Sequence, residues 1–539
     1  MNILVINLTR FGDLLQSAAA LRALARGHDG KKNRVGLVCL DNFYAGAELL
    51  ADVADIYPLP AGKIMAALNA PGAEKADTAW LSGVAGLYDW VEKTRGNFSP
   101  DKVCNISPTI AACLLGRLLA DGRECSGFTL DAFGFMQNST PWASFMQGAT
   151  ASRGNSPFNI VDLFRKVAGD TGDTPDASLL PPSREAVAAM ERQLKEAAPE
   201  GCAGFLALQL GASADIRRWP LEFFARAGDT LWERHRLLPL LLGAKSEIPL
   251  AEEYASFARQ PYYSLAGRTN ITELAAALTL SSLCISNDTG TLHLASGLAV
   301  PVLGIYLATA QVWDTGPYAI GNCSLEPDLP CHPCDFGRQC ENGHACHRAI
   351  TPETVIRLAE AALQKDAGNT ANFAAPATCK GARVWKSTRD AHGFADALSL
   401  SGHEDEDRTR WMRIERHLFR QFFDREAGKD FTPDLTHAPQ VIRSGKGHEL
   451  AAACDGVLAL FDALLQQGEM LAQNPIPLVM DRFQRTWHRL ATLLSSQPDF
   501  AAAAFLWRNE TMAASGLENA LPLVRQYHAL FRAFRAFLP

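Results

Sequence analysis

Hydrophobic residues in the first 360 positions form short runs that alternate with stretches of helical periodicity. Residues 2–8, 34–40 and 102–106 are apolar runs rich in aliphatic residues, a pattern typical of strands buried on both faces of a parallel sheet. Between the first two runs, residues 14–24 carry apolar side chains at helical spacing. Strands that alternate with helices in this way predict an α/β layer.

The same pattern starts again after a polar, proline-rich stretch at residues 170–183. We therefore expect two Rossmann-like lobes, over residues 1–172 and 173–365, with a cleft between them. Ligands of open parallel sheets bind beyond the carboxyl ends of the strands, so the loops that follow strands are expected to carry the chemistry. In the second lobe the predicted strands are 205–210, 237–243, 283–286 and 302–306, and the predicted helices are 185–197, 221–234, 271–280 and 291–298.

The composition changes near residue 366. A stretch rich in glycine, alanine, asparagine and threonine predicts a linker over 366–400, and helical periodicity with few strand signals predicts an α-helical extension over 401–539. In the last helix, at 521–537, arginines lie beside phenylalanines. This helix fits two interpretations: packing in a small bundle or peripheral contact with an anionic inner-membrane surface. The residues concerned are Arg525, Arg532, Arg535, Phe531, Phe534 and Phe537.

Composition narrows the class of protein. A net charge of -7 and a pI near 6.0 provide no general basic field for a nucleic acid partner. No run of 18 apolar residues predicts a membrane span, and Arg10 and Asp13 interrupt the first apolar run too early for a signal peptide. Most of the thirteen cysteines are scattered singly, as reduced buried thiols are. We expect a cytoplasmic globular protein.

The first candidate loop is Arg10-Phe11-Gly12-Asp13, directly after the first predicted strand. Gly12 allows a sharp turn, and Asp13 stands near the start of the following helix. An aspartate in this place is either a helix cap or a carboxylate that faces the cleft.

The second candidate loop, residues 211–220, follows the predicted strand 205–210. Gly211 and Ser213 make its first part small, and Arg217 follows them. A guanidinium group beside a loop of small residues suits a diphosphate, which it binds through charge-assisted bidentate bonds. The alternative is an arginine on a solvated surface loop.

The third candidate loop joins the predicted strand 283–286 to the helix 291–298. Asp288, Thr289 and Gly290 form the loop, and His293 falls in the first helical turn. Backbone amides and the positive end of a helix form an anion site. A histidine in this position is either structural or part of that site.

Together, the three loops resemble glycosyltransferase family 9, the family of the ADP-heptose:lipopolysaccharide heptosyltransferases. The resemblance also includes Pro301–Tyr306 and Thr315–Tyr318, and it covers roughly residues 1–360. It implies a GT-B fold in which the first lobe holds the acceptor and the second lobe holds the nucleotide-sugar donor, ADP-heptose. It also implies single displacement with inversion, without a metal or other cofactor for catalysis.

The resemblance carries over to individual residues. It implies that Asp13 is the catalytic base, with Arg10 and Gly12 on the acceptor side. Arg217 stands where the family often has lysine. The implied donor-binding residues are Arg217, Asp288, Thr289, Gly290, His293, Gly211, Ser213 and, near the nucleotide, Glu247.

The identity of the acceptor stays open at this point. A lipopolysaccharide core, another glycan or lipid-linked acceptor, and a protein are all compatible with the sequence, because acceptor contacts lie on variable loops. A non-catalytic nucleotide-sugar-binding scaffold is the alternative from outside the enzymes.

One dense cysteine cluster lies within the second lobe. Four thiols within a short tract suit a structural, tetrahedral zinc or iron site. The cluster consists of Cys331, Cys334, Cys340 and Cys346.

Overall fold

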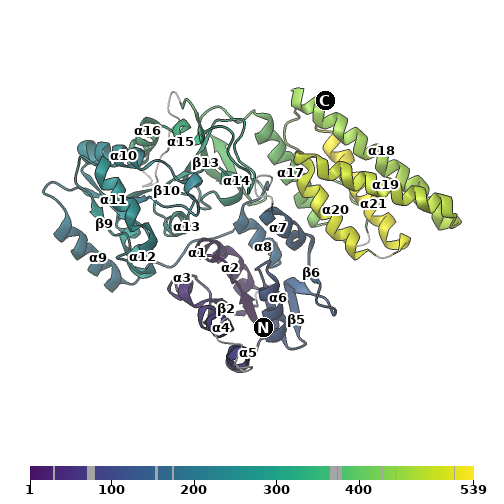
Figure 1. Ribbon diagram of the computed structural model, residues 1–539, viewed down its shortest axis with the longest axis horizontal. Coiled ribbons are helices and arrows are strands. Elements are labelled where there is room, and N and C mark those ends of the chain that lie inside the picture. Colours follow the sequence, from purple (N-terminus) through teal and green to yellow (C-terminus); the bar gives the residue numbers. More distant parts are fainter. Residues whose placement is uncertain are drawn as a thin grey trace. The chain divides into compact units, whose positions relative to one another are not determined.

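The computed structural model describes residues 1–27, 31–68, 79–151, 156–170, 172, 175–364, 373, 379–426, 429–436, 438–442, 445–514 and 516–539. The chain divides into two compact units, each of which is described by itself (Figure 1). The α/β unit comprises Met1–Ser139 and Asn159–Ser401, and the helical unit comprises Thr140–Phe158 and Gly402–Pro539.

The first lobe of the α/β unit is built on a six-stranded sheet with the order β3-β2-β1-β4-β5-β6. Neighbouring strands are parallel except for β6, which is antiparallel to β5. The apolar run of β1 is fully buried from Leu4 to Ile6, as the continuous hydrophobic pattern predicts. The strands are β1 (Asn2–Ile6), β2 (Arg34–Leu40), β3 (Asp55–Leu59), β4 (Lys102–Asn105), β5 (Glu124–Leu130) and β6 (Met136–Asn138).

The predicted helix over 14–24 is two helices in the structure. The break lies at Ser17, whose hydroxyl donates a hydrogen bond to the carbonyl oxygen of Leu14 at 2.7 Å. The first of these helices begins at Phe11, so that Gly12 and Asp13 lie inside it. The helices of this lobe are α1 (Phe11–Gln16), α2 (Ala18–Arg26), α3 (Tyr44–Ala47), α4 (Ala61–Leu68), α5 (Ala79–Phe98), α6 (Ile110–Ala120) and α8 (Ile160–Val167).

The second lobe is built on an eight-stranded sheet with the order β14-β13-β12-β11-β10-β7-β8-β9. The strands from β12 to β9 are parallel, and β13 and β14 join one edge as an antiparallel hairpin. The strands are β7 (Gly204–Gln209), β8 (Leu237–Leu242), β9 (Tyr263–Ser264), β10 (Ser281–Asn287), β11 (Val302–Ile305), β12 (Cys323–Pro327), β13 (Ala382–Arg389) and β14 (Ala395–Ser399).

Helices surround this second sheet, and Trp219 is wholly buried in the core beside it. The predicted fold class, two Rossmann-like α/β lobes of GT-B type with a helical C-terminal region, is confirmed. The helices are α9 (Arg184–Ala197), α10 (Leu221–His235), α11 (Ile248–Phe257), α12 (Ile271–Thr279), α13 (Gly290–Gly297), α14 (Val312–Thr315), α15 (Cys346–Ala349) and α16 (Pro352–Leu363).

The predicted linker over 366–400 differs from what the structure describes. Residues 365–372 and 374–378 lie outside the described residues. The part after them forms the β13–β14 hairpin, and Val384 and Trp385 on β13 are buried. Because β13 pairs with β12, this segment completes the second sheet and belongs to the α/β unit.

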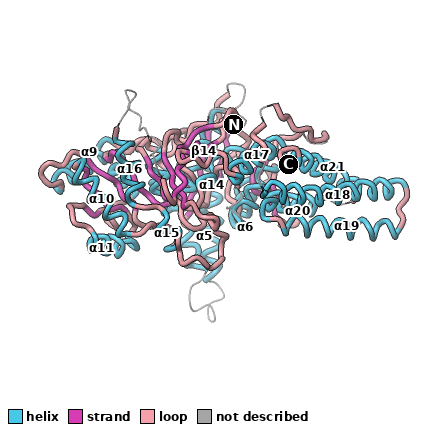
Figure 2. The backbone as a smooth tube through the Cα atoms, turned by 90° about the horizontal axis from the view of Figure 1, so that it is seen from above, coloured by secondary structure: helices cyan, strands magenta, loops and turns pink. Residues whose placement is uncertain are grey.

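The helical unit contains the predicted C-terminal helices and one helix from the middle of the chain. The long helices run side by side in both views (Figures 1 and 2). In α7, Trp142 and Phe145 pack against Phe423 with ring centroids 4.8 and 5.1 Å apart. The helices are α7 (Pro141–Ala151), α17 (Asp407–Phe423), α18 (Gly445–Gln473), α19 (Pro477–Ser496), α20 (Ala501–Ala513) and α21 (Leu517–Arg535).

The aromatic residues near the C-terminus are part of the core of the helical unit. Phe531, Phe534 and Phe537 are between 0 and 4% exposed. The apolar face of α21 is therefore covered by neighbouring helices, which contradicts its use as a membrane-binding face. None of the helices within the described ranges has the length and apolar character to cross a membrane.

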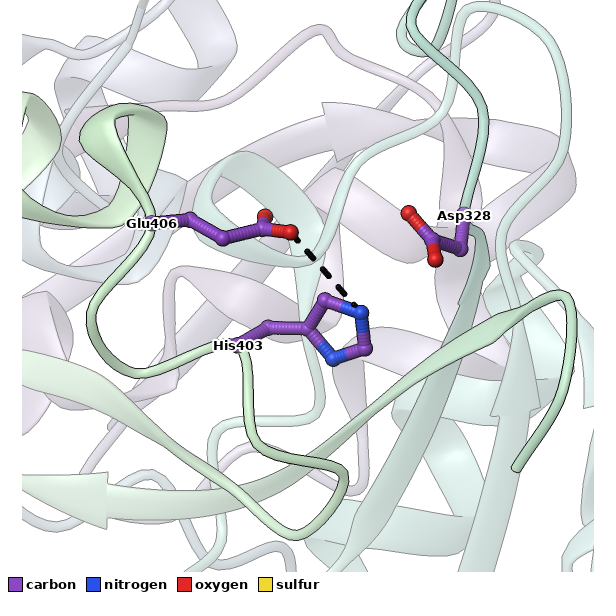
Figure 3. A group of neighbouring side chains, drawn as sticks. All are labelled: Asp328, His403 and Glu406. Carbon is purple, nitrogen blue, oxygen red and sulfur yellow. Dashed lines mark ion pairs between the residues drawn. The ribbon is translucent and has the colours of Figure 1, made fainter. Parts of the chain in front are cut away.

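The start of α17 carries a charged pair. His403 and Glu406 are linked by an ion pair of 3.8 Å between Nε2 and Oε1 (Figure 3). Asp328, also drawn in Figure 3, belongs to the α/β unit and pairs there with Arg383 at 3.1 Å.

Candidate functional site

The candidate loops lie where the strand order of each sheet reverses. In the first sheet this switch lies between β1 and β4, and the loop after β1 leads into α1. In the second sheet it lies between β7 and β10, which the 211–220 and 288–290 loops follow. Crevices at such switch points are the usual ligand sites of open parallel sheets.

The two lobes approach each other at the N-termini of α1 and α13. A Cβ atom built on Gly12 would lie 3.1 Å from Cδ2 of His293 and 3.2 Å from Cα of Gly290. A Cβ atom built on Gly290 would lie 2.6 Å from Cδ1 of Phe11. A side chain at Gly290 would therefore force Phe11 to move, and one at Gly12 would fit only tightly against α13.

This approach brings the turn that contains Asp13 to the N-terminus of α13. Asp13 is half-buried and lies in the first turn of α1, while the N-cap position belongs to Arg10, which is exposed. Asp13 is therefore not the N-cap residue of the helix, one of the two roles open from sequence. Its carboxylate belongs to the turn that meets α13.

Asn287, at the end of β10, holds the 211–220 loop in place. Its side chain is fully buried. It donates to the carbonyl oxygens of Leu210 and Gly211 at 3.0 and 3.1 Å, and accepts from the backbone N–H of Trp219 at 3.0 Å. Sequence analysis assigns Asn287 no role, although its position at a strand end between two loops is a usable signal.

Arg217 is buried beneath the same loop. Its Nε donates to Oγ1 of Thr309 at 2.6 Å, and its NH1 group donates to Oγ of Ser213 at 3.3 Å. The same NH1 group lies 3.8 Å from a carboxylate oxygen of Asp288. With 8% exposure, Arg217 is not a solvated surface arginine, because its guanidinium lies between Ser213 of the 211–220 loop and Asp288 of the 288–290 loop.

Glu247 is connected by hydrogen bonds to the end of β7, which precedes the 211–220 loop, and through it to α13. Its Oε2 accepts from the N–H of Ala244 at 2.8 Å and from Gln209 at 3.4 Å, and Gln209 in turn accepts from the hydroxyl of Thr291 at 2.9 Å. A Cβ atom built on Gly211 would lie 1.4 Å from Oε1 of Glu247. Gly211 therefore makes room for the Glu247 carboxylate.

His293 is buried and faces Asp288, with 3.8 Å between Nε2 and Oδ1. Thr289 is the N-cap residue of α13, and its hydroxyl lies 3.2 Å from that of Ser286. Burial first, and then Asp288, raise the pKa of Tyr306 well above its ordinary range. The phenol therefore stays protonated.

A cavity of about 520 Å³ opens beside α1 and α13 within the α/β unit. His293, in the first turn of α13 after the 288–290 loop, lines it. Next to it, Tyr318 donates to Asp162 at 2.6 Å, and Arg165 pairs with Asp162 at 3.0 Å. Other lining residues are Leu15, Gln16, Ser296 and Arg389.

The cysteine cluster packs behind the 211–220 loop. Burial first, and then the thiols of Cys346, Cys331 and Cys340, raise the pKa of Cys334. The sulfur of Cys340 accepts from the N–H of His344 at 3.3 Å. Over the described ranges, no three of these sulfur atoms lie within 4.8 Å of one another.

Comparison with known proteins agrees with these motifs. Residues 132–345 match the family model described as glycosyltransferase family 9 (heptosyltransferase). The chain is 30% identical over 166 residues to lipooligosaccharide heptosyltransferase 2 of Campylobacter jejuni, which is 30% of this chain and 51% of that protein. It is 31% identical over 146 residues to lipopolysaccharide heptosyltransferase 1 of Pseudomonas aeruginosa, 26% of this chain and 39% of that protein.

The chain thus spans about half, or less, of the length of these curated relatives. Among solved structures, the ADP-heptose lipopolysaccharide heptosyltransferase II of E. coli is similar with a TM-score of 0.48 and 16% identity, over 67% of this chain and 98% of that one.

Proposed function

This chain belongs to glycosyltransferase family 9, and from that premise we propose that it transfers a heptose from ADP-heptose to a lipopolysaccharide core glycan. The observation that carries the proposal is the approach of α1 to α13. It brings the turn that contains Asp13 against Gly290 and His293 of the donor loop. A carboxylate on one lobe beside an anion-binding loop on the other is what sugar transfer from a diphosphate requires.

In the proposed mechanism, Asp13 accepts the proton of the acceptor hydroxyl as the hydroxyl attacks the anomeric carbon. The departing diphosphate gathers negative charge. Arg217 and the backbone amides of Thr289 and Gly290 at the start of α13 stabilise that charge. These groups provide the positive charge at the diphosphate, so the proposed reaction uses no metal. The sugar is transferred in a single displacement, with inversion.

Asp288, His293 and the Gln209–Glu247 pair complete the donor side of the proposal. Glu247 lies next to Gly211 at the end of β7, where a nucleotide ribose in a Rossmann-like crevice commonly lies near an acidic side chain. Asp288 faces both Arg217 and His293 at 3.8 Å. In the proposed donor site, Asp288 therefore orients these two side chains.

The proposed acceptor is supported by the relatives of this chain, which are heptosyltransferases of lipooligosaccharide and lipopolysaccharide. We assign the reaction to the cytoplasmic face of the inner membrane, where a lipid-linked core is accessible. Any peripheral contact with that membrane uses a surface other than the aromatic face of α21, because that face is buried.

The test is a transfer assay with purified protein, ADP-heptose and a core acceptor that lacks heptose. We expect ADP release only when both are present. UDP- and GDP-sugars in place of ADP-heptose should give little or no release. Hydrolysis of the donor at the same rate without acceptor, or transfer from a UDP-sugar in preference, contradicts the proposal. Stable donor binding without any transfer supports the scaffold alternative.

We also propose that Cys331, Cys334, Cys340 and Cys346 bind one structural zinc or iron ion. Four thiolates are one of the ligand sets that structural zinc and iron sites use, and metal binding would draw the four sulfur atoms together. Elemental analysis should find about one equivalent of metal. Cys334→Ser should lose it and Cys379→Ser, a thiol outside the cluster, should keep it. Metal-free protein with four reactive thiols overturns this assignment.

A further inference from the structure

The cysteine segment 331–347 contacts the donor site at several points. The backbone N–H of Cys334 donates to the carbonyl oxygen of Ala308 at 2.8 Å. The ring of His332 bonds to the carbonyl oxygen of Ala310 at 3.0 Å. The segment therefore holds the turn 307–310 through two hydrogen bonds.

The backbone of this turn needs such support. Ala308 has a φ of 55°, which lies in the left-handed region that residues with a Cβ atom rarely adopt. The carbonyl oxygen of Ala308 is bonded to the cysteine segment through the N–H of Cys334. The next residue is Thr309, whose side chain direction follows from this conformation.

Thr309 is the residue through which the turn reaches the donor site. It is 6% exposed, and its Oγ1 accepts from Nε of Arg217 at 2.6 Å. On another side of the same guanidinium, the ring centroid of Phe336 lies 5.3 Å from Cζ of Arg217, within cation–π range. Phe336 belongs to the cysteine segment, so both contacts depend on it.

A further contact holds the backbone beside the arginine. His347 makes a hydrogen bond through Nε2 to the carbonyl oxygen of Ile216 at 2.8 Å. The Thr309 hydroxyl, the Phe336 ring and the backbone of Ile216 thus surround the guanidinium. Each of them belongs to the cysteine segment or is held by it. A guanidinium that binds a diphosphate bidentately must be oriented as well as charged.

We propose that Thr309 and Phe336 are positioning residues that orient Arg217 toward the donor diphosphate, and that the cysteine segment holds both of them in place. This inference rests on the proposed donor site and goes beyond it. It assigns the cysteine segment to donor binding rather than to the stability of the second lobe alone.

The experiment measures the dissociation constants of ADP and AMP by calorimetry for the full-length protein. Thr309→Val removes the acceptor of the Arg217 bond at nearly constant volume. It should weaken ADP binding about tenfold, the loss expected for one charge-assisted hydrogen bond, and change AMP binding much less. Thr309→Ser keeps a hydroxyl and should restore ADP binding. A merely structural role does not predict this difference between the two nucleotides.

Phe336→Leu should weaken ADP binding by about threefold, because an exposed cation–π contact is a small effect. Phe257→Leu is the matched control, since Phe257 is also an exposed phenylalanine of the second lobe. In the double variant, Phe336→Leu should add nothing to Arg217→Ala, because coupled residues are not additive.

The outcomes separate this inference from the proposed function. If the wild-type protein does not bind ADP, or if Arg217→Ala binds it normally, the donor assignment itself fails. If Arg217→Ala weakens ADP binding while Thr309→Val and Phe336→Leu do not, only the positioning role fails. It also fails if Thr309→Ser is as weak as Thr309→Val, or if the Phe336 and Arg217 effects add.

Discussion

Replacing Asn287 by alanine tests whether hydrogen bonds from the end of β10 hold the 211–220 loop in its conformation. The substitution removes three hydrogen bonds with donor–acceptor distances of 3.0, 3.1 and 3.0 Å. Two of them bind the carbonyl oxygens of Leu210 and Gly211, where the 211–220 loop begins. The third binds the N–H of Trp219 near the end of the loop. Because Asn287 and Trp219 are both 0% exposed, water does not replace the lost partners without movement of the loop.

The expected loss of stability can be estimated from these three hydrogen bonds. A net contribution of about 1 kcal/mol for each intramolecular hydrogen bond gives a loss of about 3 kcal/mol in the free energy of unfolding. The α/β unit is larger than a folding unit of 150–250 residues, so the fall in Tm should be smaller than the roughly 6–12 °C expected for such a unit. Loss of loop order should also weaken ADP binding by at least about tenfold.

Asn322→Ala is the matched control. Asn322 is also buried in the second lobe, and its side chain bonds to Val302, Ala319 and Ser296 at 2.9, 3.0 and 3.4 Å, away from the donor loops. None of these partners belongs to the 211–220 or 288–290 loop, so the variant should lose similar stability and bind ADP normally well below its Tm. The reasoning is refuted if both variants weaken ADP binding equally, or if Asn287→Ala melts lower but binds ADP like wild type.

Three other predictions concern single side chains. Asp13→Asn should bind ADP-heptose normally and transfer it about 10²–10⁴-fold more slowly, and near-normal turnover removes Asp13 from the mechanism. Gly211→Ala should displace the Glu247 carboxylate and weaken donor binding, and adding Glu247→Ala should cause no further loss in calorimetry. Burial first, and then Asp499, raise the pKa of Glu415 well above its ordinary range. Ionisation of Glu415 therefore opposes folding as pH rises, so Glu415→Gln should raise Tm at about pH 7 and not near pH 4.

The strands and the loops after them were predictable from sequence because a buried parallel strand is a short continuous apolar run. The runs at 2–8, 205–210 and 283–286 correspond to β1, β7 and β10, and the strand order then fixes where their loops meet. Sequence alone did not show that Gly12 and Gly290 touch. That contact depends on the packing of two lobes, and a glycine that follows a strand is equally well suited to a tight turn within its own loop.

The residues that support the 211–220 loop through hydrogen bonds were harder to predict. Asn287 and Thr309 act through hydrogen bonds to groups 68 to 92 positions away, and no local pattern records such a partner. The β13–β14 hairpin was predicted as linker for a different reason. Its strands follow a stretch rich in small residues, and only Val384 and Trp385 mark β13 as buried, which is too short a signal to separate from a loop.

The last helix shows why an amphipathic pattern alone does not identify a binding surface. Apolar residues at helical spacing are required equally by a bundle core and by a membrane-bound helix, so α21 fits both. The structure separates the two through its partners. Phe531 packs against Phe461 and Phe500 of the same unit. Arg535, one of the arginines that favoured an anionic lipid surface, pairs with Asp455 of α18 at 2.7 Å. With its apolar face covered and this charge matched inside the unit, α21 has a packing role in the helical unit.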